Sequence, residues 1–222
     1  FNNLETISFH YVGKQTIWSD TNDFGDKAFA IPKSINLTNI KNLRVSNSPY
    51  LSLPDLKIFE NLETLEINNH LDENKENFKT LPSFKYLKNF SINMYYPTIK
   101  EEEKEPLKNL ENSKNLESIN IDGIHTTRYN FETDVERWSL SDVKLDKISS
   151  LKKLKQLRID GISLEDLKKL KNLNNIEKFE LTNPTVITKA MNSDEGTVDP
   201  PMTEENLLFI KDMKNLTELK LF

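Results

Sequence analysis

The sequence predicts an α/β chain built from stacked coils, each of which contributes one short parallel β-strand. An apolar pattern, leucine-x-x-leucine-x-leucine, occurs eight times along the chain. Within each copy apolar and polar residues alternate, as they do in a strand that is buried on one face. Between copies the chain supplies the crossovers that parallel strands need. One such unit cannot bury its apolar side alone, so the copies are expected to stack.

The eight copies share one arrangement of residues. We number their positions as slots, counting from the first apolar residue. Slots one, four and six are apolar, whereas slots three, five and seven are mostly polar and are expected to point away from the core. The first slots are 22 residues apart in two places and 25 to 40 residues apart elsewhere. The copies begin at Leu4, Ile40, Leu62, Leu87, Leu116, Leu154, Ile176 and Leu216.

The segments between the copies predict short helices and longer insertions. Leucines recur at every third residue from Leu164 to Leu173, and side chains three apart line up on one side of a 3₁₀ turn. Pro200 and Pro201, followed by Thr203, predict a helix that starts near Glu204. Longer gaps predict insertions, which in stacked repeats form loops on one face, often the binding face. These insertions span 13–34, 95–110, 125–141 and 183–202.

The unit that starts at Leu154 resembles the 22-residue leucine-rich repeat of bacterial internalin-like proteins, and the resemblance covers nearly the whole chain in degenerate form. It implies an α/β leucine-rich-repeat solenoid of about eight irregular repeats across residues 1–222. The implied fold has a curved parallel β-sheet on the concave side and short helices or 3₁₀ turns on the convex side. The family usually places asparagine at slot nine, where this chain has other residues, so we expect that asparagine ladder to be missing.

Composition excludes several kinds of function. The chain has 222 residues, a net charge of −5 and no basic block that would follow a phosphate backbone, so nucleic acid is not the expected partner. Without cysteine there are no disulfides or thiolate metal sites. No apolar run is long enough to insert into a membrane. The three histidines lack metal-ligand spacing and the five glycines build no phosphate loop, so we expect no cofactor, no metal and no catalytic residues.

Two groups of residues are candidates for binding a partner. Aromatic, histidine and arginine side chains follow the ends of several strands and are expected to form a rim, because such residues are frequent at interface hot spots. They are His10, Tyr11, His70, Tyr95, Tyr96, His125, Arg128 and Tyr129. The alternative interpretation is that these residues pack over the edges of the coils. A second group forms the polar centre of the sheet: Asn89, Ser91, Asn93, Ser118 and Asn120.

The slot-five residues predict ion pairs between neighbouring strands. Arg44 is expected beside Glu66, and a second set is expected to run from Arg158 through Glu180 to Lys220. Such pairs contribute only a few tenths of a kcal/mol at a surface. We therefore interpret most of this face as charge-balanced and solvated.

These observations favour a non-enzymatic module that recognises another protein. The missing cysteines suggest a bacterial or an intracellular protein, and we expect a secreted, surface-displayed or effector protein of a bacterium. The chain starts at Phe1 and stops at Phe222 within a repeat, so we expect a fragment of a longer protein. In one alternative it is the targeting part of a larger enzyme or toxin. In another it is a structural spacer.

Overall fold

The computed structural model describes eight strands and the turns that lead into them. The residues described are 3–10, 36–46, 53–68, 81–93, 109–122, 145–160, 167, 170, 172–182 and 203–221. Seven strands span slots three to seven of a repeat. They are β1 (Thr6–His10), β2 (Asn42–Ser46), β3 (Thr64–Asn68), β4 (Asn89–Asn93), β5 (Ser118–Asp122), β6 (Gln156–Asp160) and β7 (Lys178–Thr182). The eighth strand, β8, spans Glu218–Leu221.

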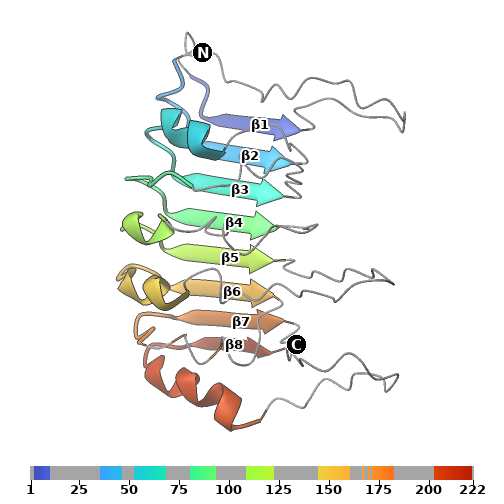
Figure 1. Cartoon of the computed structure of the whole chain (residues 1–222), viewed down its shortest axis with the longest axis vertical. Coiled ribbons are helices and arrows are strands. Elements are labelled where there is room, and N and C mark those ends of the chain that lie inside the picture. Colours follow the sequence, from blue (N-terminus) through green and yellow to red (C-terminus); the bar gives the residue numbers. More distant parts are fainter. Residues whose placement is uncertain are drawn as a thin grey trace, which may run out of the picture.

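The strands form one parallel sheet in sequence order, from β1 to β8 (Figure 1). Equal slots lie opposite each other in every neighbouring pair, so that Leu43 of β2, for example, faces Ile7 of β1 and Leu65 of β3. The predicted parallel sheet is therefore confirmed, including its alignment. A slip of one residue would expose every apolar side chain of a strand, so the apolar pattern fixes this register.

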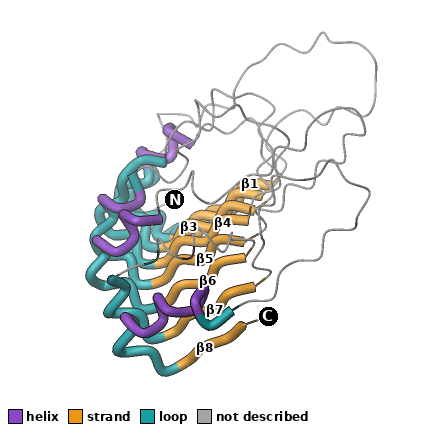
Figure 2. The backbone as a smooth tube through the Cα atoms, turned by 60° about the horizontal axis from the view of Figure 1, so that its bottom comes forward, coloured by secondary structure: helices purple, strands orange, loops and turns teal. Residues whose placement is uncertain are grey.

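Short 3₁₀ helices precede several of the strands. They are η1 (Leu53–Ile58), η3 (Leu110–Asn112), η5 (Leu145–Ser150) and η6 (Glu205–Asp212). Figure 2 shows the helices and the loops gathered on one side, with the strands on the other. The predicted helix start near Glu204 is confirmed. There the Oδ1 atom of Asn206 accepts hydrogen bonds from both the N–H and the hydroxyl of Thr203, at 2.9 and 2.6 Å.

The core is one continuous apolar stripe made by slots one, four and six together with residues of the turns. In the inner coils these side chains are almost completely buried, and large aromatic rings such as Phe59, Phe90 and Phe179 fill it. Phe209 of η6 packs edge-to-face on Phe179 of β7, with ring centroids 5.6 Å apart, a geometry that aromatic pairs favour. In the outermost strand β8, Leu219 and Leu221 are 43% and 38% exposed.

Main-chain hydrogen bonds join each coil to the next in the same way. The slot-two carbonyl of one coil accepts two N–H groups of the next coil, from its slots two and three. The carbonyl of Glu5, for example, accepts from Lys41 and Asn42 at 2.9 and 3.0 Å. The same pair of hydrogen bonds to one carbonyl recurs at all seven junctions between strands in the described residues. It ties the start of every strand to the strand before it.

An asparagine ladder is present, but its residues precede the strands in the sequence. The slot-nine residues themselves fall outside the described part of the chain. The residue just before slot one is asparagine in six of the eight repeats, and four of these donate from Nδ2 to a main-chain carbonyl of the preceding coil. The bonds are Asn61 to Thr38 (2.7 Å), Asn115 to Lys85 (2.7 Å), Asn175 to Lys152 (2.8 Å) and Asn215 to Asn174 (2.9 Å).

The coil that carries β4 has no 3₁₀ helix in its described turn, 81–88. In other coils the corresponding helix pairs a main-chain carbonyl with an N–H three residues later, as Ser113 N–H does with the carbonyl of Leu110 at 2.9 Å. Here side chains of the next coil replace that bond. Asn109 donates to the carbonyl of Leu81 at 3.1 Å, and Ser113 accepts from the N–H of Phe84 at 3.1 Å. Both buried main-chain groups are thereby satisfied.

Candidate functional site

The outward side chains at slots three, five and seven form what we call the polar face of the sheet. They point away from the apolar core because side chains alternate along a strand. Within the described strands they are exposed or half-buried, with Asp160, at 7% exposure, as the one buried member. The face therefore offers a polar surface that crosses all eight strands.

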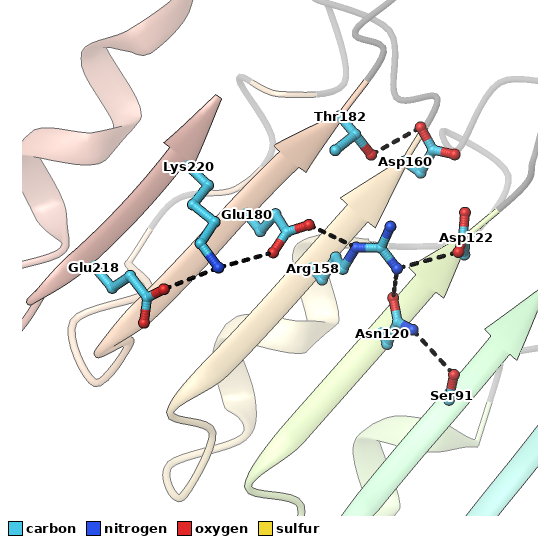
Figure 3. Close-up of polar contacts among 9 residues, drawn as sticks. All are labelled: Ser91, Asn120, Asp122, Arg158, Asp160, Glu180, Thr182, Glu218 and Lys220. Atoms are coloured by element: carbon cyan, nitrogen blue, oxygen red, sulfur yellow. Dashed lines mark hydrogen bonds and ion pairs between the residues drawn. The ribbon is translucent and has the colours of Figure 1, made fainter. Parts of the chain in front are cut away.

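Arg158 on β6 is the centre of the largest polar network on this face (Figure 3). Its Nε donates to Glu180 Oε1 of β7 at 2.9 Å, and its Nη1 donates to Asp122 Oδ2 of β5 at 3.1 Å. The same Nη1 lies 3.4 Å from Asn120 Oδ1, and Asn120 donates in turn to Ser91 of β4 at 3.1 Å. One guanidinium thus links three strands directly and a fourth through Asn120. Its fixed fork of donors suits this arrangement.

The network continues across β7 and β8. Lys220 lies 3.0 Å from Glu218 and 3.8 Å from Glu180, and Lys178 lies 3.2 Å from Glu218 (Figure 3 shows the Lys220 contacts). At the other end of the sheet Arg44 pairs with Glu66 at 2.7 Å. These contacts confirm the slot-five pairs expected from the sequence. Each is partly exposed, so each contributes less than about 1 kcal/mol to stability.

Two carboxyl groups lie next to each other at the slot-seven end of β5 and β6. Burial, followed by a hydrogen bond to Asp160, raises the pKa of Asp122, and the positive charge of Arg158 offsets only part of this rise. Asp160 also accepts a hydrogen bond from the Thr182 hydroxyl at 2.8 Å. For Arg158, burial alone would lower the pKa, but the carboxylates of Asp122 and Glu180 outweigh it and raise the pKa further. The negative charge of Asp160 also raises the pKa of Asp122, because a like charge disfavours the ionised form of its neighbour.

Slot three forms an uncharged row, which we call the neutral row, along the first six strands. Hydroxyl and amide side chains alternate in it: Thr6, Asn42, Thr64, Asn89, Ser118 and Gln156. Two of the amides donate to the preceding hydroxyl, Asn42 to Thr6 at 3.3 Å and Asn89 to Thr64 at 3.4 Å. These contacts are long and leave each amide oxygen available to a further donor.

Slot two, beside the neutral row, alternates in charge over seven coils: Glu5, Lys41, Glu63, Lys88, Glu117, Lys155 and Glu177. Salt bridges join Glu5 to Lys41 at 2.6 Å, Glu63 to Lys88 at 2.7 Å and Lys155 to Glu177 at 2.9 Å. The hydrogen bond that Lys88 donates lowers the pKa of Glu63, and the hydrogen bond that Lys41 donates to Glu5 raises the pKa of Lys41. Charge therefore alternates from coil to coil beside a row that carries none.

The polar face is hollowed over β5 to β8. The hollow has a volume of about 340 Å³, and its walls are the slot-three and slot-five side chains of these four strands. They include the uncharged Ser118 and Gln156 as well as the paired Arg158, Lys178 and Glu218. The hollow meets the end of the neutral row at Gln156.

The structure describes three of the ten residues that the sequence predicts to bind a partner. Asn93 and Asn120 lie on the neighbouring strands β4 and β5, both on the polar face. The Oδ1 atom of Asn93 is buried, and within the described ranges it has no hydrogen-bond partner. His10 is exposed on β1, and two strands separate it from β4, so these three residues do not form one compact site. The others lie outside the described residues: Tyr11, His70, Tyr95, Tyr96, His125, Arg128 and Tyr129.

The neutral row and the alternating charges beside it were missed by the sequence reasoning, although the signal is visible in the sequence. Slots two and three read Glu-Thr, Lys-Asn, Glu-Thr, Lys-Asn, Glu-Ser and Lys-Gln in the first six repeats. Comparing repeats two apart, rather than neighbours, reveals this alternation. The alternation gains a structural meaning once the strands are known to lie in sequence order. Each inner glutamate of slot two then lies between two lysines, and each inner hydroxyl of slot three lies between two amides.

Comparison with known protein families and with curated proteins finds no match for this chain. In the parts of the chain that the structure describes, no three His, Cys, Asp or Glu side chains gather into a group that could hold a metal ion. None of the helices in those parts is long and apolar enough to cross a membrane. The case for a function therefore rests on the geometry of the polar face.

Proposed function

We propose that this chain is a leucine-rich-repeat solenoid that binds another protein through its polar face and has no enzymatic activity of its own. The observation that carries the proposal is the uninterrupted polar face, which crosses eight strands in register over a continuous core. Taking about 4.8 Å between strands, this face extends over roughly 34 Å, which suits a folded partner or a long segment.

Charge on the face supports a protein rather than nucleic acid as the partner. Phosphate backbones require clusters of unpaired lysine and arginine, whereas Arg44, Arg158, Lys178 and Lys220 are all paired with carboxylates. A bacterial secreted, surface or effector protein remains our proposal for the biological setting. It rests on the composition of the chain and on the repeat pattern.

The test compares three forms of the protein as baits for partner capture. The face variant combines Asn89→Arg with Ser118→Arg, which places two large cations on neighbouring strands of the polar face. The control variant combines Asn112→Arg with Asn174→Arg, which adds the same charge at exposed positions in the turns. We expect proteins captured by the wild type and by the control to be lost from the face variant. Capture that the face variant leaves intact would contradict the proposal.

A further inference from the structure

Most charged side chains of the polar face form ion pairs with one another. Arg44 pairs with Glu66, and Arg158 pairs with both Asp122 and Glu180. Beyond these, Lys178 and Lys220 share Glu218, and Asp160 accepts a hydrogen bond from Thr182. A charged partner would have to compete with these contacts and lose its own hydration, so charge gives this face little attraction for it.

Uncharged groups of this face offer further hydrogen-bonding capacity, and several of them lie on the neutral row. The side chains of Ser118 and Gln156 have no hydrogen-bond partner among the described residues, and the side chains of Asn42 and Asn89 use only one amide hydrogen each. The buried Oδ1 atom of Asn93, on the same face, also has no donor in the described part of the chain. Asn89, Ser118 and Gln156 lie opposite one another on β4, β5 and β6.

We propose that the neutral row binds an extended, uncharged peptide segment of the partner protein, an inference that rests on the proposed function. A peptide main chain carries one donor and one acceptor at each residue. Amide and hydroxyl side chains can likewise both donate and accept. The neutral row can therefore form hydrogen bonds with a peptide main chain without depending on the side chains of that peptide. Ser118 and Gln156 also line the hollow over β5 to β8, which gives the segment a seat at one end of the row.

The experiment uses a library of random peptides displayed on phage and selected against the immobilised wild-type protein. Selected peptides are synthesised, and their Kd values are measured with two variants. The amide variant combines Asn42→Ala, Asn89→Ala and Gln156→Ala, which removes neutral hydrogen-bonding groups. The matched charge variant combines Arg44→Ala, Lys178→Ala and Lys220→Ala, which removes three cations of the same face. Thermal unfolding of both variants checks that they fold, and Asn89→Ala alone replaces the amide variant if it does not.

We expect the selected peptides to be poor in charged residues. The amide variant should bind them at least about tenfold more weakly, because several hydrogen bonds are lost. The charge variant should change Kd by less than about threefold, and raising NaCl from about 0.05 to 0.5 M should have a similarly small effect, since no unpaired charge is screened.

Other outcomes overturn the inference in distinguishable ways. Charged peptides whose binding falls with salt and with the charge variant would show that the face recognises charge, while leaving the proposed function intact. Peptides that bind all variants equally, including the face variant with Asn89→Arg and Ser118→Arg, would contradict both proposals. If no peptide is selected, the inference of a peptide segment is wrong.

Discussion

The hydroxyl oxygen of Ser113 accepts a hydrogen bond from the main-chain N–H of Phe84, 3.1 Å away in the preceding coil. Ser113 is completely buried, at a position where Leu, Phe or Met stands in the other coils. We predict that Ser113→Ala lowers the free energy of unfolding by about 1–3 kcal/mol, because it leaves a buried N–H unsatisfied. Urea unfolding followed by circular dichroism measures this.

Ser113→Leu is the more informative companion variant, because it restores the residue type found in the other coils. If the serine merely fills space, leucine should be tolerated or should stabilise the coil. We expect it to destabilise the protein at least as much as alanine, since Phe84 still lacks an acceptor. Ser118→Ala is the control and should change stability little, because the side chain of Ser118 lies on the polar face and has no hydrogen-bond partner among the described residues.

The asparagine ladder gives a second prediction. Asn175 donates from Nδ2 to the carbonyl of Lys152 at 2.8 Å, so Asn175→Ala should cost about 0.5–1.5 kcal/mol, the net value of one hydrogen bond. The adjacent Asn174 is also exposed, and among the described residues only its main-chain carbonyl takes part in a hydrogen bond, which it accepts from Asn215. Asn174→Ala should therefore leave the urea midpoint nearly unchanged. Equal losses in the two variants would mean that the ladder does not hold the coils together.

Much of the fold could be predicted from the sequence because the coils repeat. The apolar slots specify which face of each strand is buried, and equal slots can meet only if the strands lie parallel and in register. Leu65, for example, has an apolar slot-four residue on each side, Leu43 and Phe90. The slot-five pairs followed from that register as well, and Arg44 and Glu66 do form an ion pair.

Other features could not be predicted because they depend on particular coils rather than on the repeat. Nothing in the pattern indicates that Asn109 and Ser113 replace the helical hydrogen bond of the preceding coil. The network around Arg158 also extends further than slot five, since Asp122 belongs to slot seven. Most of the predicted aromatic rim lies outside the described residues, so that part of the candidate site remains a prediction.

The charge alternation at slot two predicts a dependence of stability on pH. The hydrogen bond from Lys88 to Glu63, at 2.7 Å, lowers the pKa of Glu63 below its ordinary value of about 4.3. A lowered pKa in the folded state means that the pair stabilises the protein above about pH 4.3 and that this contribution disappears as the pH falls through the folded value.

The matched variant for this prediction is Glu63→Gln, which keeps the size of the side chain. It should be less stable than the wild type at pH 7, by a small margin that shrinks in high salt, and equal to it near pH 2. Glu60→Gln is the control, since Glu60 has no ion-pair partner among the described residues. Urea midpoints measured from pH 2 to 7 decide the matter. A difference between Glu63→Gln and the wild type that does not vary with pH would rule out the ion pair as its cause.

Asp122 predicts the opposite dependence on pH. Burial, with the neighbouring Asp160, raises its pKa in the folded protein, so its ionised form costs stability and this cost appears as the pH rises through the raised value. Asp122→Asn removes the charge and keeps an oxygen that can accept from Arg158 Nη1. We therefore expect the stability of this variant to match or exceed that of the wild type at pH 7, by less than about 1 kcal/mol for a partly exposed group, and to lose this advantage at low pH.

Asp122→Ala, which removes the acceptor as well, should be less stable than Asp122→Asn throughout. If Asp122→Asn were clearly less stable than the wild type at pH 7, the attraction between Asp122 and Arg158 would outweigh both the burial of the carboxylate and its repulsion from Asp160.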